Sequence, residues 1–297
     1  MPLTLQRRWL AAACVVPLVT AVGPAARDAE RTPIGYCVAL DRLEVADTLG
    51  FDYLEVPAQA VAALSAEDFN RLLARVKALR VPVRAANSFV PASVRLTGPE
   101  ADPVRQREYV VSCLDRLASL GVRTLVFGSG GARRVPGGFP RDRAAAQLVA
   151  FGRLAASEAA TRGITIVLEP LRRQESNIVN SVGEALPIVR AVDHPAFRVL
   201  VDFYHLSEEQ EDPAIIREAG DLLRHVHVAN PSGRAFPKRA DEADYAPFIT
   251  ALKAIGYRGG VSVEARTEDL AGDAPQAIAL LRALLGEGAT AKAGEPR

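Results

Sequence analysis

Short apolar runs alternate with longer amphipathic segments along most of this chain. Each run spans four or five residues, which is typical of strands that are buried on both faces of a parallel sheet. The predicted strands cover residues 34–38, 53–56, 83–87, 124–127, 165–169, 198–202, 225–228 and 260–264. The regular spacing of these runs predicts repeated strand–helix units.

The segments between the runs carry helix signals. Leu72, Leu73 and Val76 lie on one apolar stripe at helical spacing. Helix starts are indicated by a capping box, Ser181 with Glu184, and by Asp212 before a proline. Glycines separate helical runs from the next strand at four places, namely Gly50, Gly121, Gly163 and Gly256.

Eight strand–helix units predict an α/β fold, a single (β/α)8 TIM barrel over residues 32–286. The alternative is an open, doubly wound sheet. It is disfavoured because no glycine-rich nucleotide-binding fingerprint follows the first strand.

The two ends of the chain differ from this central part. Arg7 and Arg8 precede an apolar run over residues 9–22 and then small residues, which predicts an export signal of the twin-arginine type over residues 1–26. The alternative is an N-terminal helix of a cytosolic protein. The run is short for a membrane span, so no stable insertion is expected after cleavage. We expect a periplasmic or secreted protein, with a disordered tail at residues 287–297.

Charge and cysteine content narrow the class of protein. The formal net charge is +1, and about −1 without the predicted signal, which gives no electrostatic footprint for nucleic acid. Of three cysteines, Cys14 lies in the signal, while Cys37 and Cys113 lie far apart in apolar stretches. This pattern predicts two buried thiols and no disulfide framework.

Polar side chains stand at the ends of neighbouring predicted strands. Glu169 ends the fifth, Asp202 the sixth and Glu264 the eighth, while His227 lies near the end of the seventh. Because the carboxyl ends of barrel strands meet at the mouth, we expect these four residues to bind one divalent cation. Oxygen ligands with one imidazole suit Mn²⁺ or Mg²⁺, with Co²⁺ and Zn²⁺ as alternatives. His225, deeper in its strand, is expected to be a core histidine.

Other polar residues are expected around the same mouth. Glu55 and Asn87 end the second and third predicted strands and are candidates to bind substrate hydroxyls, the alternative being a loop cap or an arginine partner. Residues 128–140 contain several glycines together with Arg133 and Arg134. This stretch predicts either a cradle for a phosphate or carboxylate, or a solvated lid without a ligand.

Four motifs resemble the sugar phosphate isomerase/epimerase superfamily, the xylose isomerase-like barrels that include ketose 3-epimerases and hydroxypyruvate isomerase. The motifs are residues 166–171 (Ile-Val-Leu-Glu-Pro-Leu) with Glu175, residues 201–205 (Val-Asp-Phe-Tyr-His), residues 225–227 (His-Val-His) and residues 256–264 (Gly-Tyr-Arg-Gly-Gly-Val-Ser-Val-Glu). The resemblance runs from about residue 34 to residue 285.

The resemblance implies roles for individual residues. It implies metal binding by the four residues named above, proton transfer by Glu169 and Glu264, and substrate contacts from three residues, namely Glu175, His205 and Arg234. Arg234 lies one residue further from the strand-seven histidine than in the ketose 3-epimerases, and Asn230 stands where they carry a glutamate. We therefore do not expect this chain to share the sugar preference of the ketose 3-epimerases.

The expected function is a metal-dependent isomerase or epimerase acting on a small sugar or related ketone through an enediolate. One alternative is a dehydratase of a polyol-like ketone on the same metal site, and another is a non-catalytic exported sugar-binding barrel. A nuclease of the apurinic endonuclease branch is disfavoured, because the chain has four histidines and no basic surface. The expected partner is a sugar-like small molecule, and a homo-oligomer is compatible with the sequence.

Overall fold

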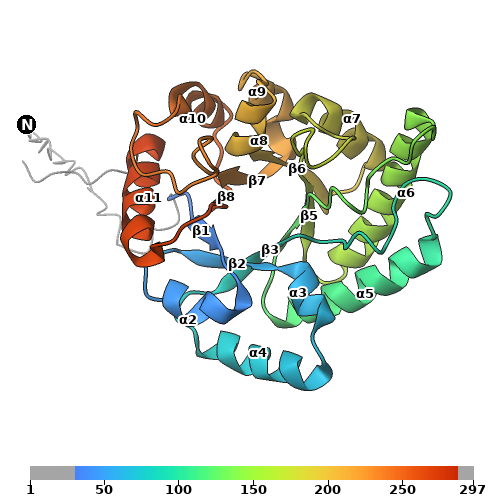
Figure 1. Ribbon diagram of the computed structural model, residues 1–297, viewed down its shortest axis with the longest axis horizontal. Helices are drawn as coiled ribbons and strands as arrows, with labels where there is room; N and C mark the ends of the chain where they lie inside the picture. Colours follow the sequence, from blue (N-terminus) through green and yellow to red (C-terminus); the bar gives the residue numbers. More distant parts are fainter. Residues whose placement is uncertain (1–30, 287–297) are drawn as a thin grey trace, which may run out of the picture. The chain divides into compact units, whose positions relative to one another are not determined.

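The predicted strands form a closed parallel barrel. The computed structural model of the protein describes residues 31–286, in which each strand pairs in parallel with the next and β8 returns to β1 (Figure 1). The strands are β1 (Ile34–Cys37), β2 (Tyr53–Pro57), β3 (Val83–Asn87), β4 (Thr124–Phe127), β5 (Thr165–Leu168), β6 (Phe197–Asp202), β7 (Leu223–Val228) and β8 (Gly260–Val263). No strand end differs from its predicted position by more than two residues, so the predicted barrel is confirmed.

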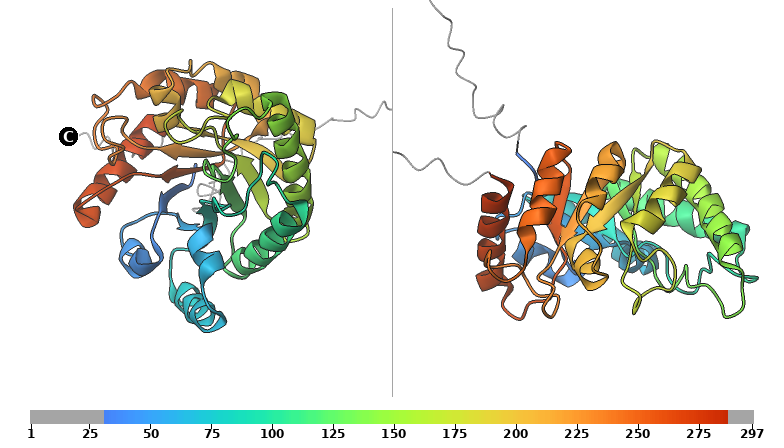
Figure 2. Two further views of the ribbon diagram at one scale, coloured as in Figure 1. Left: turned by 45° about the vertical axis from the view of Figure 1, so that its right-hand side comes forward. Right: turned by 90° about the horizontal axis from the view of Figure 1, so that it is seen from above.

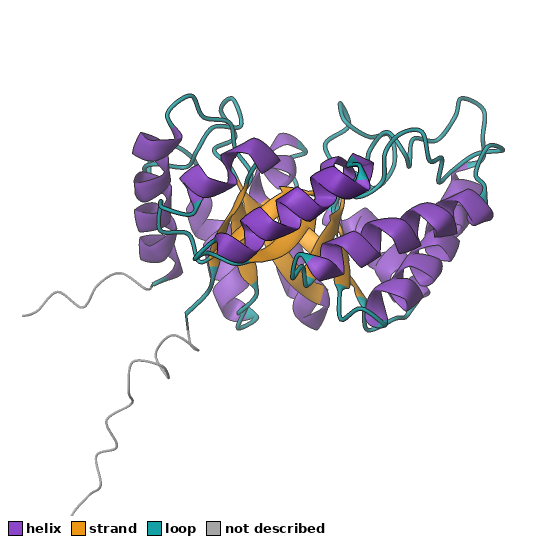
Figure 3. Cartoon of the chain, turned by 90° about the horizontal axis from the view of Figure 1, so that it is seen from below, coloured by secondary structure: helices purple, strands orange, loops and turns teal. Residues whose placement is uncertain are grey.

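Helices surround the barrel on its outside (Figures 2 and 3). The α-helices are α2 (Leu43–Ala46), α3 (Ala58–Ala63), α4 (Ala66–Ala78), α5 (Pro103–Ser119), α6 (Arg141–Ala160), α7 (Val182–Val192), α8 (Phe203–Glu208), α9 (Ile215–Ala219), α10 (Tyr245–Ala254) and α11 (Leu270–Leu285). Two 3₁₀ helices, η1 (Leu40–Arg42) and η2 (Gly220–Leu222), lie in the connections. Among the described helices, none combines the length and apolarity needed to cross a membrane.

The helix signals in the sequence have the expected structural basis. The hydroxyl of Ser181 accepts a hydrogen bond from the backbone N–H of Glu184 at the start of α7. Asp212 caps a turn by accepting from the N–H of Ala214, and helix α9 begins only at Ile215. The four predicted stop glycines all have positive φ angles, which a residue with a Cβ adopts rarely.

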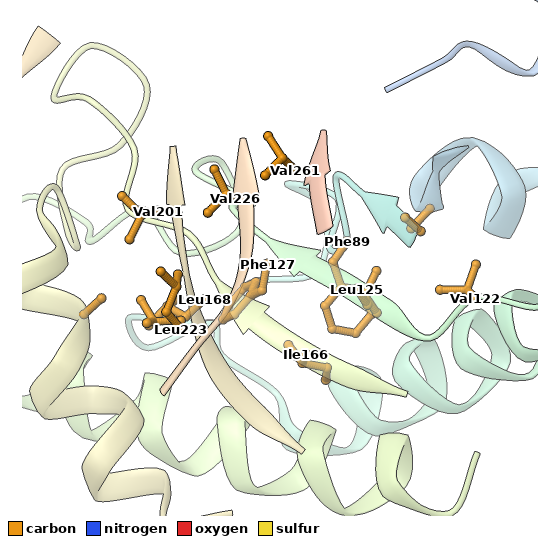
Figure 4. Close-up of a cluster of buried hydrophobic side chains, with 14 of the residues drawn as sticks. Phe89, Val122, Leu125, Phe127, Ile166, Leu168, Val201, Leu223, Val226 and Val261 are labelled. Atoms are coloured by element: carbon orange, nitrogen blue, oxygen red, sulfur yellow. The ribbon is translucent and has the colours of Figure 1, made fainter. Parts of the chain in front are cut away.

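Inner and outer positions alternate along the strands. Phe127 and Leu168 belong to the large apolar layer that fills the space between strands and helices (Figure 4). Val126, Val167 and Leu200, one position away on three consecutive strands, form a separate small cluster. Successive side chains point to opposite faces of a strand, so this cluster lies inside the barrel.

The other half of the barrel interior is polar. Glu55 on β2, His225 and His227 on β7, and Ser262 on β8 are buried and alternate with residues of the outer apolar layer. They therefore share the inner face with the apolar cluster. Inside the barrel, β4, β5 and β6 thus contribute an apolar cluster, whereas β7, β8 and β2 contribute polar side chains.

Two loops at the carboxyl ends of the strands are joined to each other. In the loop after β7, the backbone N–H of Asn230 donates to the carbonyl of Ala235 at 2.8 Å. The N–H of Arg266, in the loop after β8, donates to the carbonyl of Arg234 at 2.8 Å. The loops after β7 and β8 therefore form one hydrogen-bonded unit at the rim.

Two predictions concern the ends of the chain. The export signal at residues 1–26, with Cys14, and the tail at residues 287–297 both lie outside the described residues. Within the described part, Cys37 and Cys113 are free thiols; Cys113 is buried, as predicted, whereas Cys37 is only partly buried.

Candidate metal centre and active site

The four predicted metal ligands converge at the carboxyl end of the barrel. Glu169 and Glu264 directly follow β5 and β8, Asp202 ends β6, and His227 lies in β7. The Nδ1 atom of His227 lies 3.2 Å from Oε1 of Glu169 and 3.3 Å from Oε2 of Glu264. One ligand atom from each of the four residues lies within 4.8 Å of the others. This spacing is compatible with shared coordination of one cation.

Three of the four candidate ligands carry a buried atom without a hydrogen-bond partner in the described part of the chain. Glu169 Oε1, Asp202 Oδ2 and His227 Nδ1 are buried and have no hydrogen-bond partner among the described residues. Buried polar atoms without partners are costly and uncommon in folded proteins. Since three of the four candidate ligands present such an atom to the same place, the donor set fits a divalent cation.

The electrostatics of the cluster lead to the same conclusion. Burial, together with the charges of Glu264 and Glu169, raises the pKa of Asp202 to about 7. Burial and the Glu264 charge also raise the pKa of Glu169. Burial disfavours the charged form of Glu264 as well, but His227 and Arg234 outweigh it and hold the pKa at about 2. Three crowded carboxylates leave surplus negative charge, which a divalent cation relieves.

Arg234 extends over the cluster from the loop after β7. Its guanidinium pairs with Glu264, lies 3.8 Å from Oδ2 of Asp202, and approaches Oε1 of Glu175 to 3.5 Å. The same group stacks over the ring of Tyr204, 4.8 Å from its centroid. Its backbone has a φ of 53°, in the left-handed region. The residue that the resemblance assigned to substrate contact therefore lies at the site.

His205, on α8, presents a hydrogen-bond donor beside Asp202. Its Nδ1 accepts from the backbone N–H of Arg172 at 3.2 Å, so the proton of the neutral ring resides on Nε2. That Nε2 is buried without a partner among the described residues, 3.6 Å from Oδ2 of Asp202. Burial lowers the pKa of His205 to about 3, which keeps the ring neutral.

A cavity of about 390 Å³ opens over these groups. Predicted residues that line it are Glu169, Glu175, Arg234 and Glu264, and further polar lining comes from Gln59, Ser88 and Ser129. Asn87 borders the cluster and donates to Oε1 of Glu264 at 3.3 Å. The volume suits a small polar ligand.

Glu55 lies below the mouth instead of in its lining. It is fully buried. Its Oε1 is 3.0 Å from Nε2 of His227, and its Oε2 accepts from Ser262 and lies 2.9 Å from Nε2 of His225. Burial disfavours its charged form, but the two histidines outweigh this and bring the pKa of Glu55 well below its ordinary value. Since both of its oxygens have protein partners, the predicted contact between Glu55 and substrate has no geometrical support.

The two arginines after β4 have different surroundings. Arg133 is fully buried, and its guanidinium donates to the carbonyls of Phe127, Glu169 and Val179 and to the hydroxyl of Ser176. Burial lowers its pKa to about 10. Arg133 therefore stabilises the backbone around Glu169. Because it is buried and donates to the protein, the prediction that it helps to bind a phosphate or carboxylate is wrong. Arg134 is exposed.

Gly128 leaves room for the carboxylate of Glu169, because a Cβ atom at position 128 would overlap Oε2 of Glu169. We expect Gly128→Ala to displace this carboxylate and to weaken Mn²⁺ binding by about tenfold or more, as measured by titration calorimetry on metal-free protein. Gly137→Ala is the matched control, because nothing lies within 4 Å of its added Cβ. Equal affinities for the two variants would contradict this role of Gly128.

Sequence reasoning missed three residues near the centre. Ser262 contacts Glu55, the Cys37 thiol lies 4.0 Å from Nε2 of His227, and Tyr204 supports Arg234. A signal for Ser262 was present, because it precedes Glu264 by two residues and so shares its face of the strand. The contact between Tyr204 and Arg234 gives no such signal, because it depends on the conformation of the loop that carries Arg234.

Comparisons with known proteins agree with the observed barrel. A family model described as "Xylose isomerase-like TIM barrel" matches residues 43–284. The L-ribulose 3-epimerase of Methylomonas sp. (strain DH-1) is 29% identical over 226 residues, which cover 74% of this chain and 76% of that protein. The D-psicose 3-epimerase of Ruminiclostridium cellulolyticum is 28% identical over 232 residues, or 75% of this chain and 76% of that protein.

A solved structure is similar over nearly its whole length. A D-psicose 3-epimerase crystallised in the presence of D-fructose aligns with a TM-score of 0.75 at 21% identity, covering 86% of this chain and 99% of that one. This likeness supports the fold. The two curated relatives named above are epimerases by name, which confirms the expected class of enzyme, an isomerase. The predicted resemblance is confirmed as well: this chain belongs to the xylose isomerase-like TIM barrel family.

Proposed function

We propose that this protein is a divalent-metal-dependent epimerase or isomerase of a small, unphosphorylated ketose, acting through an enediolate. The observation that carries the proposal is the meeting of four ligand atoms from Glu169, Asp202, His227 and Glu264, three of them buried without a protein partner. The names of the two curated relatives described above, an L-ribulose 3-epimerase and a D-psicose 3-epimerase, support a ketose as substrate. The export signal proposed at residues 1–26 favours a sugar without a phosphate, since sugar phosphates are mainly intracellular.

Two carboxylates are placed to move a proton. Glu169 follows β5 and Glu264 follows β8, so they reach the cavity from strands that are separated by β6 and β7. Removal of the proton α to a carbonyl by one carboxylate and its return from the other side inverts that carbon. A bound divalent cation would offset the negative charge that develops on the substrate oxygens.

The remaining polar groups orient the sugar. The guanidinium of Arg234 and the carboxylate of Glu175 line the cavity, and His205 offers its Nε2–H beside Asp202. Donors and acceptors at fixed positions hold a reacting carbon close to the two glutamates. Asn230 stands in the rim loop where the ketose 3-epimerases that the sequence resembles carry a glutamate, so we propose a sugar preference different from theirs.

The test is exchange of an α-proton with solvent. In D₂O, metal-loaded protein is expected to incorporate deuterium into at least one member of a panel of unphosphorylated ketoses, as measured by NMR. Chelation of the metal is expected to reduce the rate by about 10²-fold or more, and added Mn²⁺ to restore it. Loss of water from the sugar, giving a deoxy product, would instead identify a dehydratase. Sugar binding without exchange would contradict an enzymatic role.

A further inference from the structure

His227 is contacted through both of its ring nitrogens. Its Nδ1 faces Glu169 and Glu264 in the metal centre, while its Nε2 lies 3.0 Å from Oε1 of Glu55 on the opposite side. Both His227 and Glu55 are fully buried. An imidazole binds a cation through the nitrogen that lacks a proton, so the group facing the other nitrogen decides how well the ring serves as a ligand.

Glu55 accepts hydrogen bonds and, when ionised, donates none. The proton of a neutral His227 ring therefore resides on Nε2, where Glu55 accepts it, and the lone pair on Nδ1 faces the cation site. The Sγ atom of Cys37 also lies near Nε2, at 4.0 Å. A thiol is a weak acceptor beside a carboxylate, so Glu55 determines the tautomer.

Glu55 is itself held in place by hydrogen bonds. Its Oε2 accepts from the hydroxyl of Ser262 at 2.6 Å and lies 2.9 Å from Nε2 of His225. The hydroxyl of Tyr53 contacts Ser262 at 2.7 Å. Because Ser262 donates its proton to Glu55, Tyr53 is the donor in that last contact. The carboxylate is thus satisfied on both oxygens and fixed relative to strands β2, β7 and β8.

The surroundings show that packing alone does not require this arrangement. Elsewhere inside the barrel, β4, β5 and β6 contribute the apolar cluster of Val126, Val167 and Leu200. A buried carboxylate costs free energy unless it is fully paired, and an apolar residue at position 55 would avoid that cost. The buried polar residues inside the barrel, Glu55, His225 and Ser262, instead lie next to His227.

We infer that Glu55 is a positioning residue for the metal centre: it fixes His227 in the tautomer and orientation that present Nδ1 to a divalent cation. This inference rests on the metal site proposed above, and it is independent of the sugar. Glu169, Asp202 and Glu264 would complete the coordination.

The test compares Mn²⁺ binding to metal-free wild type, Glu55→Gln and Tyr53→Phe by titration calorimetry. The glutamine keeps the shape but turns either its carbonyl or its amide to His227, so affinity is expected to fall by about 10- to 100-fold. Tyr53→Phe is the matched control: it removes a buried hydroxyl of the same network that touches neither Glu55 nor His227. Its affinity is expected to stay within about threefold of wild type.

A spectroscopic measurement separates positioning from general damage to the fold. In Mg²⁺-loaded protein with ¹⁵N-labelled histidines, wild-type His227 is expected to show a protonated Nε2, and Glu55→Gln a loss of that single tautomer. Unfolding in urea without metal checks that each variant is folded.

The possible results have distinct meanings. If wild type binds no metal, both the proposed function and this inference are overturned. If wild type binds one Mn²⁺ and Glu55→Gln binds it equally well with an unchanged His227 tautomer, only the inference fails. Two bound ions in wild type and one in Glu55→Gln would show that Glu55, His225 and His227 are themselves ligands, which also overturns it.

Discussion

Replacing either Glu169 or Glu264 by glutamine is expected to reduce the rate of epimerisation by about 10²- to 10⁴-fold, because each variant lacks one of the two groups that we propose to move the proton. The carboxylate that remains still removes and returns a proton on its own side of the sugar. Each variant is therefore expected to exchange deuterium into one epimer only, without inversion. Polarimetry measures the first effect and NMR in D₂O the second, both at saturating Mn²⁺ with the metal content verified.

Asp202→Asn is the control for loss of metal. Asp202 is a proposed ligand without a role in proton transfer, so this variant should need more Mn²⁺ but retain inversion once saturated. The assignment of the two glutamates would be wrong if both glutamine variants, fully loaded with metal, inverted the sugar at more than about a tenth of the wild-type rate.

Replacing Arg133 by methionine is expected to lower the free energy of unfolding by about 3 kcal/mol or more. The change removes the side-chain donor to the buried carbonyl of Glu169 and one of two donors to the carbonyls of Phe127 and Val179, which keep the backbone N–H groups of Glu169 and Leu171. Lost hydrogen bonds and an unsatisfied buried carbonyl are among the costlier defects in a fold. Urea unfolding with a chelator present measures this effect apart from metal binding.

Arg134→Met is the matched control, because the neighbouring side chain is exposed. Its effect should stay within about 0.5 kcal/mol. If the two variants proved equally stable, the bracing role of Arg133 would be refuted.

The contrast between these two arginines illustrates what sequence can predict here. The barrel and its strands follow from short-range patterns, namely the period of apolar residues and the glycines that end helices. The candidate metal centre follows almost as directly, because Glu169, Asp202, His227 and Glu264 each stand near a strand end and the fold brings strand ends together.

Other assignments depend on contacts that no local pattern contains. Arg133 is buried by a loop some forty residues further along the chain, which includes Ser176 and Val179. Glu55 was placed at the mouth because β2 was predicted to end at residue 56. The strand continues to Pro57, which pairs with Asn87, whereas Glu55 pairs with Ala85, two residues further from the mouth, and contacts His225 and His227. The depth of Glu55 therefore depends on the register between strands, which a local pattern does not contain.

The hydrogen bond between Arg266 and Arg234 has a consequence for how this pocket diversifies. It ties the loop that carries the guanidinium to the loop that follows Glu264. We expect an insertion in either loop to disturb the position of Arg234, so this part of the rim should tolerate few changes. Gln59 and Ser88 face the same cavity from separate connections after β2 and β3. Laboratory evolution toward a new sugar should therefore accumulate its changes on that opposite rim.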